Sequence, residues 1–267
     1  LVIASFTDNQ TALVNGYSFT PEKWSLEAYQ YIASEWATIG RAYLMTILVT
    51  VIGTALSLVI TSTFAFAVSN DKLPGHKILM FLCIFTMLFN GGLVASYYVY
   101  SNIFHIKNTI WALIVPTFLM SPFNVVLVKN YFSNSISPSI LEAARMDGAG
   151  VFAVFTKIVM PLSVPIMATV GLMTAIGYWN DWTNGLYYLT ENGGSQYYTI
   201  QLVLNRINEN INFLANNSDV AAKAAQQLPS TTMRMAIAVI GILPIMCAYP
   251  FFQKYFVKGI TLGGVKE

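Results

Sequence analysis

The chain has 267 residues, 55% of them hydrophobic and only 10% charged, and its formal net charge is +2. A soluble domain averages about 25% charged residues, so this composition cannot cover a water-facing surface and places the chain in a lipid bilayer. No basic cluster is interleaved with aromatic residues, so nucleic acid is not an expected partner. The cysteines, Cys83 and Cys247, lie inside apolar runs, and the histidines, His76 and His105, lie far apart, so neither a disulfide nor a metal site is expected.

Apolar segments follow one another along the chain with short breaks. Residues 1–6 have the character of the last turns of an apolar helix, which we interpret as the end of a sixth span. A helix needs about 20 mostly apolar residues to cross a bilayer. Five segments meet that length, at about 44–69, 78–104, 108–130, 160–186 and 235–256. The sequence therefore predicts an all-α, polytopic membrane protein with five full transmembrane helices plus the end of a sixth at the N-terminus, in one domain over 1–267.

The connections between these spans predict the side of the membrane that each occupies. Short segments at 70–77 and 129–157, together with the tail after Gln253, contain eight of the fourteen Lys and Arg residues. The other six are spread over longer segments, mainly 7–43 and 186–234. Because short cytoplasmic loops are enriched in Lys and Arg, we expect the first group of segments in the cytoplasm and the C-terminus with them.

A short polar helix is predicted at about 138–149, between two of the spans. Ser137 is suited to cap it, Pro138 fits its first turn, and Gly148 ends it. The helix is too short and too polar to cross a bilayer. A polar helix of this kind, held on the cytoplasmic side, is well suited to docking a soluble partner.

One face of this helix is predicted to meet the partner. Leu141, Ala144, Arg145 and Gly148 share a face by their i, i+3, i+4, i+7 spacing, and the small residues among them allow close approach. Glu142, near the N-terminus of the helix, is favoured by the helix dipole and could pair with a basic group. An ordinary interfacial helix without a partner is the alternative.

The segment Glu142-Ala143-Ala144 with Gly148 and then Pro161 resembles the signature of the permease subunits of binding-protein-dependent ABC importers. Met160 stands where the family pattern has Leu. Residues 252–261, followed by 264–266, resemble the C-terminal signature of the carbohydrate branch of that family, the maltose-permease-like subunits. Residues 85–93 and 178–182 resemble its polysaccharide and oligosaccharide importers. The resemblance covers nearly the whole chain.

The resemblance implies a permease subunit in the inner membrane of a bacterium. The implied partners are a second, homologous permease that forms a heterodimer with this chain, two copies of a cytoplasmic ATPase subunit, and an extracytoplasmic sugar-binding protein. The implied substrates are oligosaccharides or polysaccharide fragments. The residues implied to couple the chain to the ATPase are Glu142, Ala143, Ala144, Arg145, Asp147 and Gly148.

Sequence features that are absent limit the chemistry of this chain. It contains no Gly-x-x-x-x-Gly-Lys-Ser/Thr loop, so ATP and Mg²⁺ are expected on the partner ATPase and no cofactor on this chain. No constellation of catalytic residues is recognisable, so an enzyme is not expected. A cluster of intramembrane carboxylates, as in an ion-coupled secondary transporter, is also missing, although that class remains the alternative.

The aromatic and polar run Tyr178, Trp179, Asn180 and Asp181 has two interpretations. Aromatic faces stack on sugar rings and Asn and Asp bind hydroxyls, so these residues could line the translocation path. They could instead form an interfacial aromatic belt with a helix cap, and the sequence favours this second interpretation.

Overall fold

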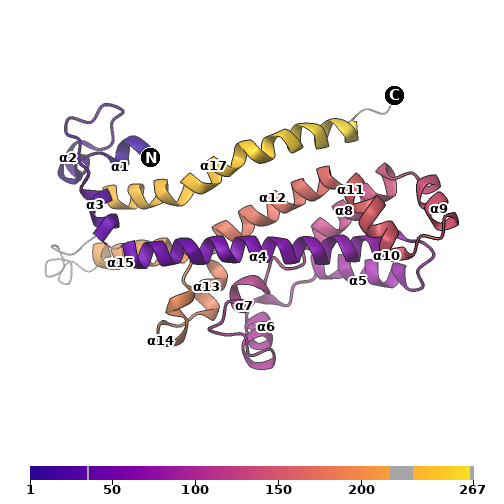
Figure 1. The fold of residues 1–267 in the computed structure, drawn as a ribbon. Coiled ribbons are helices and arrows are strands. Elements are labelled where there is room, and N and C mark those ends of the chain that lie inside the picture. Colours follow the sequence, from indigo (N-terminus) through magenta and orange to yellow (C-terminus); the bar gives the residue numbers. More distant parts are fainter. Residues whose placement is uncertain (35, 217–230, 265–267) are drawn as a thin grey trace. The chain divides into compact units, whose positions relative to one another are not determined.

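The computed structural model describes residues 1–34, 36–216 and 231–264, and these are helical without any strand (Figure 1). The predicted all-α class is confirmed for this part of the chain. Two parts of the predictions, the outer segment at 217–230 and the C-terminal Val265 and Lys266, lie outside the described residues. The helices are α1 (Val2–Ser5), α2 (Asn9–Asn15), α3 (Glu27–Ser34), α4 (Trp36–Ser69), α5 (His76–Leu88), α6 (Gly92–Tyr98), η1 (Val99–Ile103), α7 (Trp111–Ile114), α8 (Pro122–Ser135), α9 (Pro138–Met146), α10 (Val151–Val154), η2 (Phe155–Val159), α11 (Met160–Leu162), α12 (Val164–Asn180), α13 (Thr183–Tyr188), α14 (Glu191–Gly194), η3 (Ser195–Tyr197), α15 (Ile200–Asn216) and α17 (Thr231–Gly264).

The first expected span, 44–69, lies within α4, an unbroken helix of 34 residues. Its most apolar stretch has a mean hydropathy of 2.3, and only 28% of that stretch is buried by the rest of the chain. A helix that is apolar on all sides and so little covered has to face lipid or another apolar surface. By length and composition α4 can cross a membrane.

Two further expected spans, 78–104 and 160–186, are bent pairs of helices. α5 meets the continuous run α6–η1 at 119°, and the run from α10 to α11 meets α12 at 79°. At the first bend Gly92 has a φ of +80°, and its N–H donates to Asn90 Oδ1 at 2.8 Å. At the second bend Pro165 has no N–H with which to continue the helix.

The expected span at 108–130 is wrong as a single helix. The chain forms only the short α7, turns through Thr117, whose φ is +69°, and starts α8 at Pro122. Ser121 is extended, with φ −93° and ψ 120°, because the ring of a following proline disfavours the helical conformation. Hydropathy could not reveal this break, since it records composition and not continuity.

Not every expected span is a continuous helix in the structure, and the count of five full spans stays a prediction. Among the described residues one helix can cross a membrane, or up to three if each bent pair counts as one span. The last expected span, 235–256, lies within α17, a helix of 34 residues whose described apolar stretch is Thr232–Cys247.

Side chains satisfy the carbonyl groups that the break at 108–130 leaves free. The Tyr178 hydroxyl on α12 donates to the Ile114 carbonyl at 2.8 Å, and the Ser57 hydroxyl on α4 donates to the Phe118 carbonyl at 3.1 Å. The ring of Tyr178 lies so close to Gly53 that a Cβ there would be 2.5 Å from the ring. An unpaired carbonyl in an apolar environment is costly, so these contacts stabilise the irregular segment.

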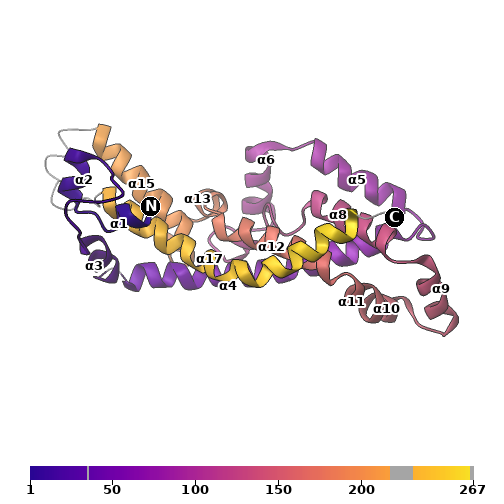
Figure 2. The same ribbon diagram turned by 90° about the horizontal axis from the view of Figure 1, so that it is seen from above.

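The chain forms two compact units. The first comprises Leu1–Leu48, Lys107–Ile110 and Trp179–Ala248. Its core joins α3, the start of α4, α15 and the start of α17, and the neighbouring α15 and α17 are visible in Figures 1 and 2. The fully buried residues at its centre are Ile200, Ala236 and Ile237.

The second unit comprises Val49–Ile106, Trp111–Tyr178 and the chain from Tyr249. Its core brings the end of α4 against α8 and the segment leading to α12, with Ala65, Val125 and Val128 entirely buried. In both views α9 lies beyond the end of α4 (Figures 1 and 2). This unit therefore holds α9 on a packed core.

Gly53→Ala should destabilise the protein by about 1–3 kcal/mol, because the added Cβ forces the Tyr178 ring away from its seat. Without that clash, Ala in a helix would stabilise it by about 1 kcal/mol relative to Gly. The matched control is Gly171→Ala, whose Cβ would meet only the end of the Leu58 side chain at 3.2 Å. Thermal unfolding midpoints in detergent measure both variants, and equal midpoints would contradict the steric argument.

Candidate functional site

The polar helix expected at 138–149 exists as α9, which is shorter at its C-terminal end. Pro138 occupies its first turn, as predicted. Ser137 precedes it with φ −61° and ψ 129°, but its side chain makes no cap hydrogen bond, contrary to expectation. Its hydroxyl lies 2.8 Å from the Ser139 hydroxyl instead.

The C-terminal end of α9 is closed by a Schellman motif at Gly148, whose φ is +81°. The Ala149 N–H donates to the Ala144 carbonyl at 2.9 Å, and the Gly148 N–H donates to the Arg145 carbonyl at 3.1 Å. This pair of bonds defines the motif and satisfies two of the carbonyls that a helix end leaves free. Gly148 therefore fixes where the helix ends and where the chain turns.

The face of α9 that was predicted to meet a partner is divided: two of its residues pack on this chain's own core, whereas Arg145 and Gly148 are exposed. Leu141 and Ala144 pack on the buried cluster of the second unit, together with Ala149 after the helix. The apolar side of a short amphipathic helix is buried by the nearest apolar surface, and here the end of α4 and α8 supply it. This chain's own core therefore covers the part of the face that carries Leu141 and Ala144, and contact of the face with a partner stays a prediction.

The opposite side of α9 is open. Ala143 and Asp147 are exposed there, Met146 is 87% exposed, and Glu142 is exposed between this side and the face that carries Leu141. Just after the helix, Phe152 is 78% exposed. Large apolar side chains at such exposure, beside charged residues, are typical of a surface that another protein covers.

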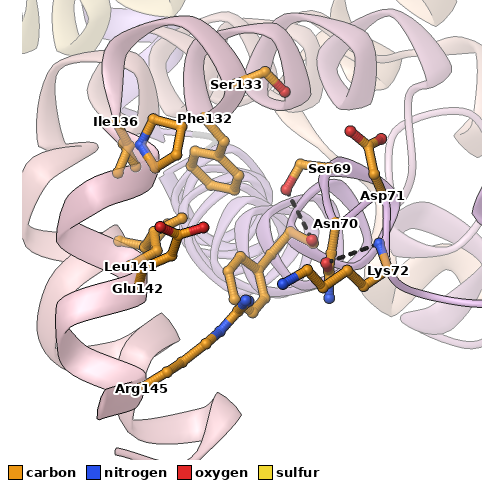
Figure 3. A pocket seen from close by; sticks show the side chains of 13 residues that line it. Ser69, Asn70, Asp71, Lys72, Phe132, Ser133, Ile136, Leu141, Glu142 and Arg145 are labelled. Atoms are coloured by element: carbon orange, nitrogen blue, oxygen red, sulfur yellow. Dashed lines mark hydrogen bonds between the residues drawn. The ribbon is translucent and has the colours of Figure 1, made fainter. Parts of the chain in front are cut away.

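A cavity of about 260 Å³ separates α9 from the loop that follows α4 (Figure 3). Figure 3 shows Arg145 extending from α9 toward Asn70 and Lys72. Glu142 lines the same cavity, as does Asp71. In the part of the chain that the structure describes, none of the ion pairs includes Glu142 or Arg145.

The sequence did not reveal that the loop at 69–72 lies beside α9. It identified the loop only as a short, Lys-containing connection. The loop keeps its own shape by local bonds: the Lys72 N–H donates to Asn70 Oδ1 at 3.2 Å, and the Ser69 hydroxyl donates to the Phe66 carbonyl at 2.8 Å. A preformed loop beside α9 adds further polar groups to the candidate docking surface.

The run at 178–181 is mostly buried in this structure. Tyr178 is 1% exposed, and Trp179 is 7% exposed with its indole N–H donating to the Gly241 carbonyl at 3.0 Å. Asp181 Oδ1 accepts from the N–H groups of Thr183 at 3.0 Å and Asn184 at 3.2 Å, which begins α13. The side chains of Tyr178 and Trp179 are therefore engaged in packing, and that of Asp181 in capping α13.

Asn180 is the exposed member of that run. Its neighbours Tyr178 and Trp179 present no open ring face to a sugar in this conformation, since both are buried.

Among the residues that the structure describes, no group of three or more His, Cys, Asp or Glu side chains could hold a metal ion.

The comparison with protein families gives a match over residues 36–262, to the binding-protein-dependent transport system inner membrane component. This chain belongs to that family. The match includes α9, its Schellman turn and both bent helix pairs, so they are parts of a transport permease and not of a catalytic enzyme.

This permease is also similar to individual proteins over nearly its whole length. It is 36% identical over 266 residues to a polygalacturonan/rhamnogalacturonan transport system permease of Bacillus subtilis, covering 100% of this chain and 90% of that protein. It is 34% identical to protein LplC of the same organism, covering 100% and 87%. A crystal structure of a bacterial ABC transporter that imports the acidic polysaccharide alginate matches with a TM-score of 0.80 at 28% identity, covering 96% of this chain and 88% of that one.

Gly148→Ala should destabilise the turn after α9 by about 1–2 kcal/mol, since a residue with a Cβ is strained at positive φ. The matched control is Gly150→Ala, because neither glycine has a heavy atom within 4 Å of an added Cβ and Gly150 has a φ of −68°. Proteolysis of the 146–152 segment in the purified permease is the measurement. Faster cleavage is expected for Gly148→Ala alone, and equal cleavage of both variants would contradict the role assigned to Gly148.

Proposed function

We propose that this chain is the permease subunit of an ATP-driven importer that takes up oligosaccharides or polysaccharide fragments delivered by an extracytoplasmic binding protein. The observation that carries the proposal is α9, a polar, glycine-ended helix with an open face, in a chain of the binding-protein-dependent transport family. The substrate class rests on the relatives, which include a polygalacturonan/rhamnogalacturonan transport permease and an importer of the acidic polysaccharide alginate.

In the membrane we propose five spans and the end of a sixth, two of them bent and the one at 108–130 broken. A break inside a span is tolerated where neighbouring helices satisfy the freed backbone groups. Tyr178 and Ser57 do this for the segment at 108–130. Broken helices of this kind also suit a protein that alternates between inward-facing and outward-facing states.

The proposed orientation has α9 and the C-terminus in the cytoplasm. The Lys- and Arg-rich short segments at 70–77 and 129–157 both belong to the second unit. The long segments at 7–43 and 186–234, where described, belong to the first unit. This grouping supports the assignment of each set of segments to one side of the membrane.

We propose that two copies of an ATPase subunit bind ATP and Mg²⁺, and that one of them docks on the open face of α9. Glu142, Ala143 and Asp147 would contact it directly, with Met146 and Phe152 supplying apolar area. Ala144 would hold the helix on its core and Gly148 would fix its end, whereas the exposed Arg145 would act from the cavity beside the loop at 69–72. Coupling requires that the ATP-bound pair prefers one state of the permease.

A second, homologous permease would complete the translocation path as a heterodimer partner. The exposed apolar surface of α4 is one place where it could pack. Within this chain, Asn180 is exposed and offers an amide to a sugar hydroxyl, whereas Tyr178, Trp179 and Asp181 would shape the path by packing and capping. The proposed contribution of the run at 178–181 is therefore mainly structural.

The energy source of uptake distinguishes the proposed ATP-driven importer from an ion-coupled secondary transporter. The complete importer in proteoliposomes should take up oligosaccharide only with ATP and binding protein present, and ionophores that dissipate proton and sodium gradients should leave uptake unchanged. The purified permease alone should hydrolyse no ATP, because it has no phosphate-binding loop. Uptake that follows an ion gradient and ignores ATP would refute the proposal.

Glu142→Lys should release the ATPase subunit, since it reverses a charge on the open face of α9. Co-purification of the ATPase should fall at least about tenfold, as expected for loss of a charged contact at an interface. The control is Glu27→Lys, an equal charge reversal at an exposed site in the first unit. Normal co-purification and transport by Glu142→Lys would show that this side chain does not meet the ATPase.

A further inference from the structure

A cavity in the first unit has the side chains of a sugar-binding site. It has a volume of about 250 Å³ and lies between α15 and the start of α17, with Trp182 at its edge. Because it lies in the unit that contains the long outer segments, it belongs to the side that faces the binding protein in the proposed orientation. It is separate from the run at 178–181.

The two helices give this cavity different chemistry. On α15, Gln201, Asn205 and Asn208 follow an i, i+4, i+7 spacing, so their amides share one face. On α17, Arg234 lines the cavity one turn before Ile237, which is 1% exposed. The cavity is therefore lined by amide groups, one cation and apolar side chains.

Arg234 is the observation that indicates an anionic ligand. It is the one charged residue among the described residues that line the cavity. Its Nε is buried and has no hydrogen-bond partner, and no ion pair among the described residues includes it. A buried guanidinium donor without an acceptor is unfavourable, and a carboxylate is the acceptor that matches its planar geometry.

The remaining lining residues suit a sugar ring. Trp182 is 39% exposed, which leaves part of an indole available for stacking. The Asn205 amide nitrogen donates to Glu209 at 3.0 Å, so its oxygen is left as an acceptor for a hydroxyl. The volume suits one sugar unit of a longer chain, because larger ligands occupy cavities of about 300 Å³ or more.

We propose that this cavity binds a carboxylate-bearing sugar unit of the incoming chain, with Arg234 on the carboxylate and Trp182 against the ring. The inference rests on the proposed function and narrows its substrate to acidic saccharides. It agrees with the relatives, since alginate is an acidic polysaccharide. A neutral sugar of the same shape would leave the Arg234 guanidinium without its partner.

The test compares an oligogalacturonate with its methyl ester, which has the same ring and no charge. Uptake by the complete importer in proteoliposomes is measured for the unmodified chain and for Arg234→Gln, normalised to inserted permease. Acid uptake should fall about tenfold, as expected when a charge-assisted hydrogen bond is lost, and ester uptake should stay unchanged. Arg234→Lys should retain part of the acid uptake, because it keeps the charge and loses the planar geometry.

Arg206→Gln is the matched control, since Arg206 belongs to the same unit but is already paired with Glu191 at 2.9 Å. It should leave both uptakes unchanged. If Arg234→Gln loses acid and ester uptake equally, Arg234 acts in packing or on lipid headgroups, and the inference is overturned. If the variant loses neither uptake, the cavity has no role in transport, and the inference is overturned as well. Uptake of neutral oligosaccharides alone by the unmodified importer overturns this inference only, whereas absence of any ATP-dependent glycan uptake overturns the proposed function.

Discussion

The contact between Tyr178 and Gly53 supports the irregular part of this permease. A bilayer supplies no hydrogen bonds, so the backbone break at 108–130 has to be satisfied by other parts of the protein. The Tyr178 hydroxyl reaches the Ile114 carbonyl because Gly53 lets its ring approach α4. Ser57, one turn further along α4, does the same for the Phe118 carbonyl. The broken segment is therefore hydrogen-bonded to two regular helices, α12 and α4.

The sequence predicted the class of this protein well and its helices only in part. Composition and segment length identify α4, since the mostly apolar residues 44–69 carry no charge and are long enough to cross a bilayer. They do not detect the break at 108–130 or the bend at Gly92, because a proline or glycine can be accommodated in a helix or can end it. The outcome depends on whether a neighbour, such as Tyr178, can satisfy the freed groups.

The candidate docking helix illustrates the same limit at the level of a single face. Pattern and motif located α9 and its end at Gly148 correctly, because both depend on local backbone chemistry. They could not show what covers its inner face, since spacing shows which residues share a face and not which surface covers it. Leu141 and Ala144 pack on this chain's own core, and the loop at 69–72 came beside α9 only through the fold.

The sparse coverage of α4 has a consequence for how a cell makes this protein. With 28% of its apolar stretch buried by its own chain, α4 is poorly protected until lipid and other subunits surround it. A chain made in excess of its partners would therefore expose a surface that quality-control proteases and chaperones recognise. Matched synthesis of the subunits, for example from one messenger RNA, would keep that exposure brief.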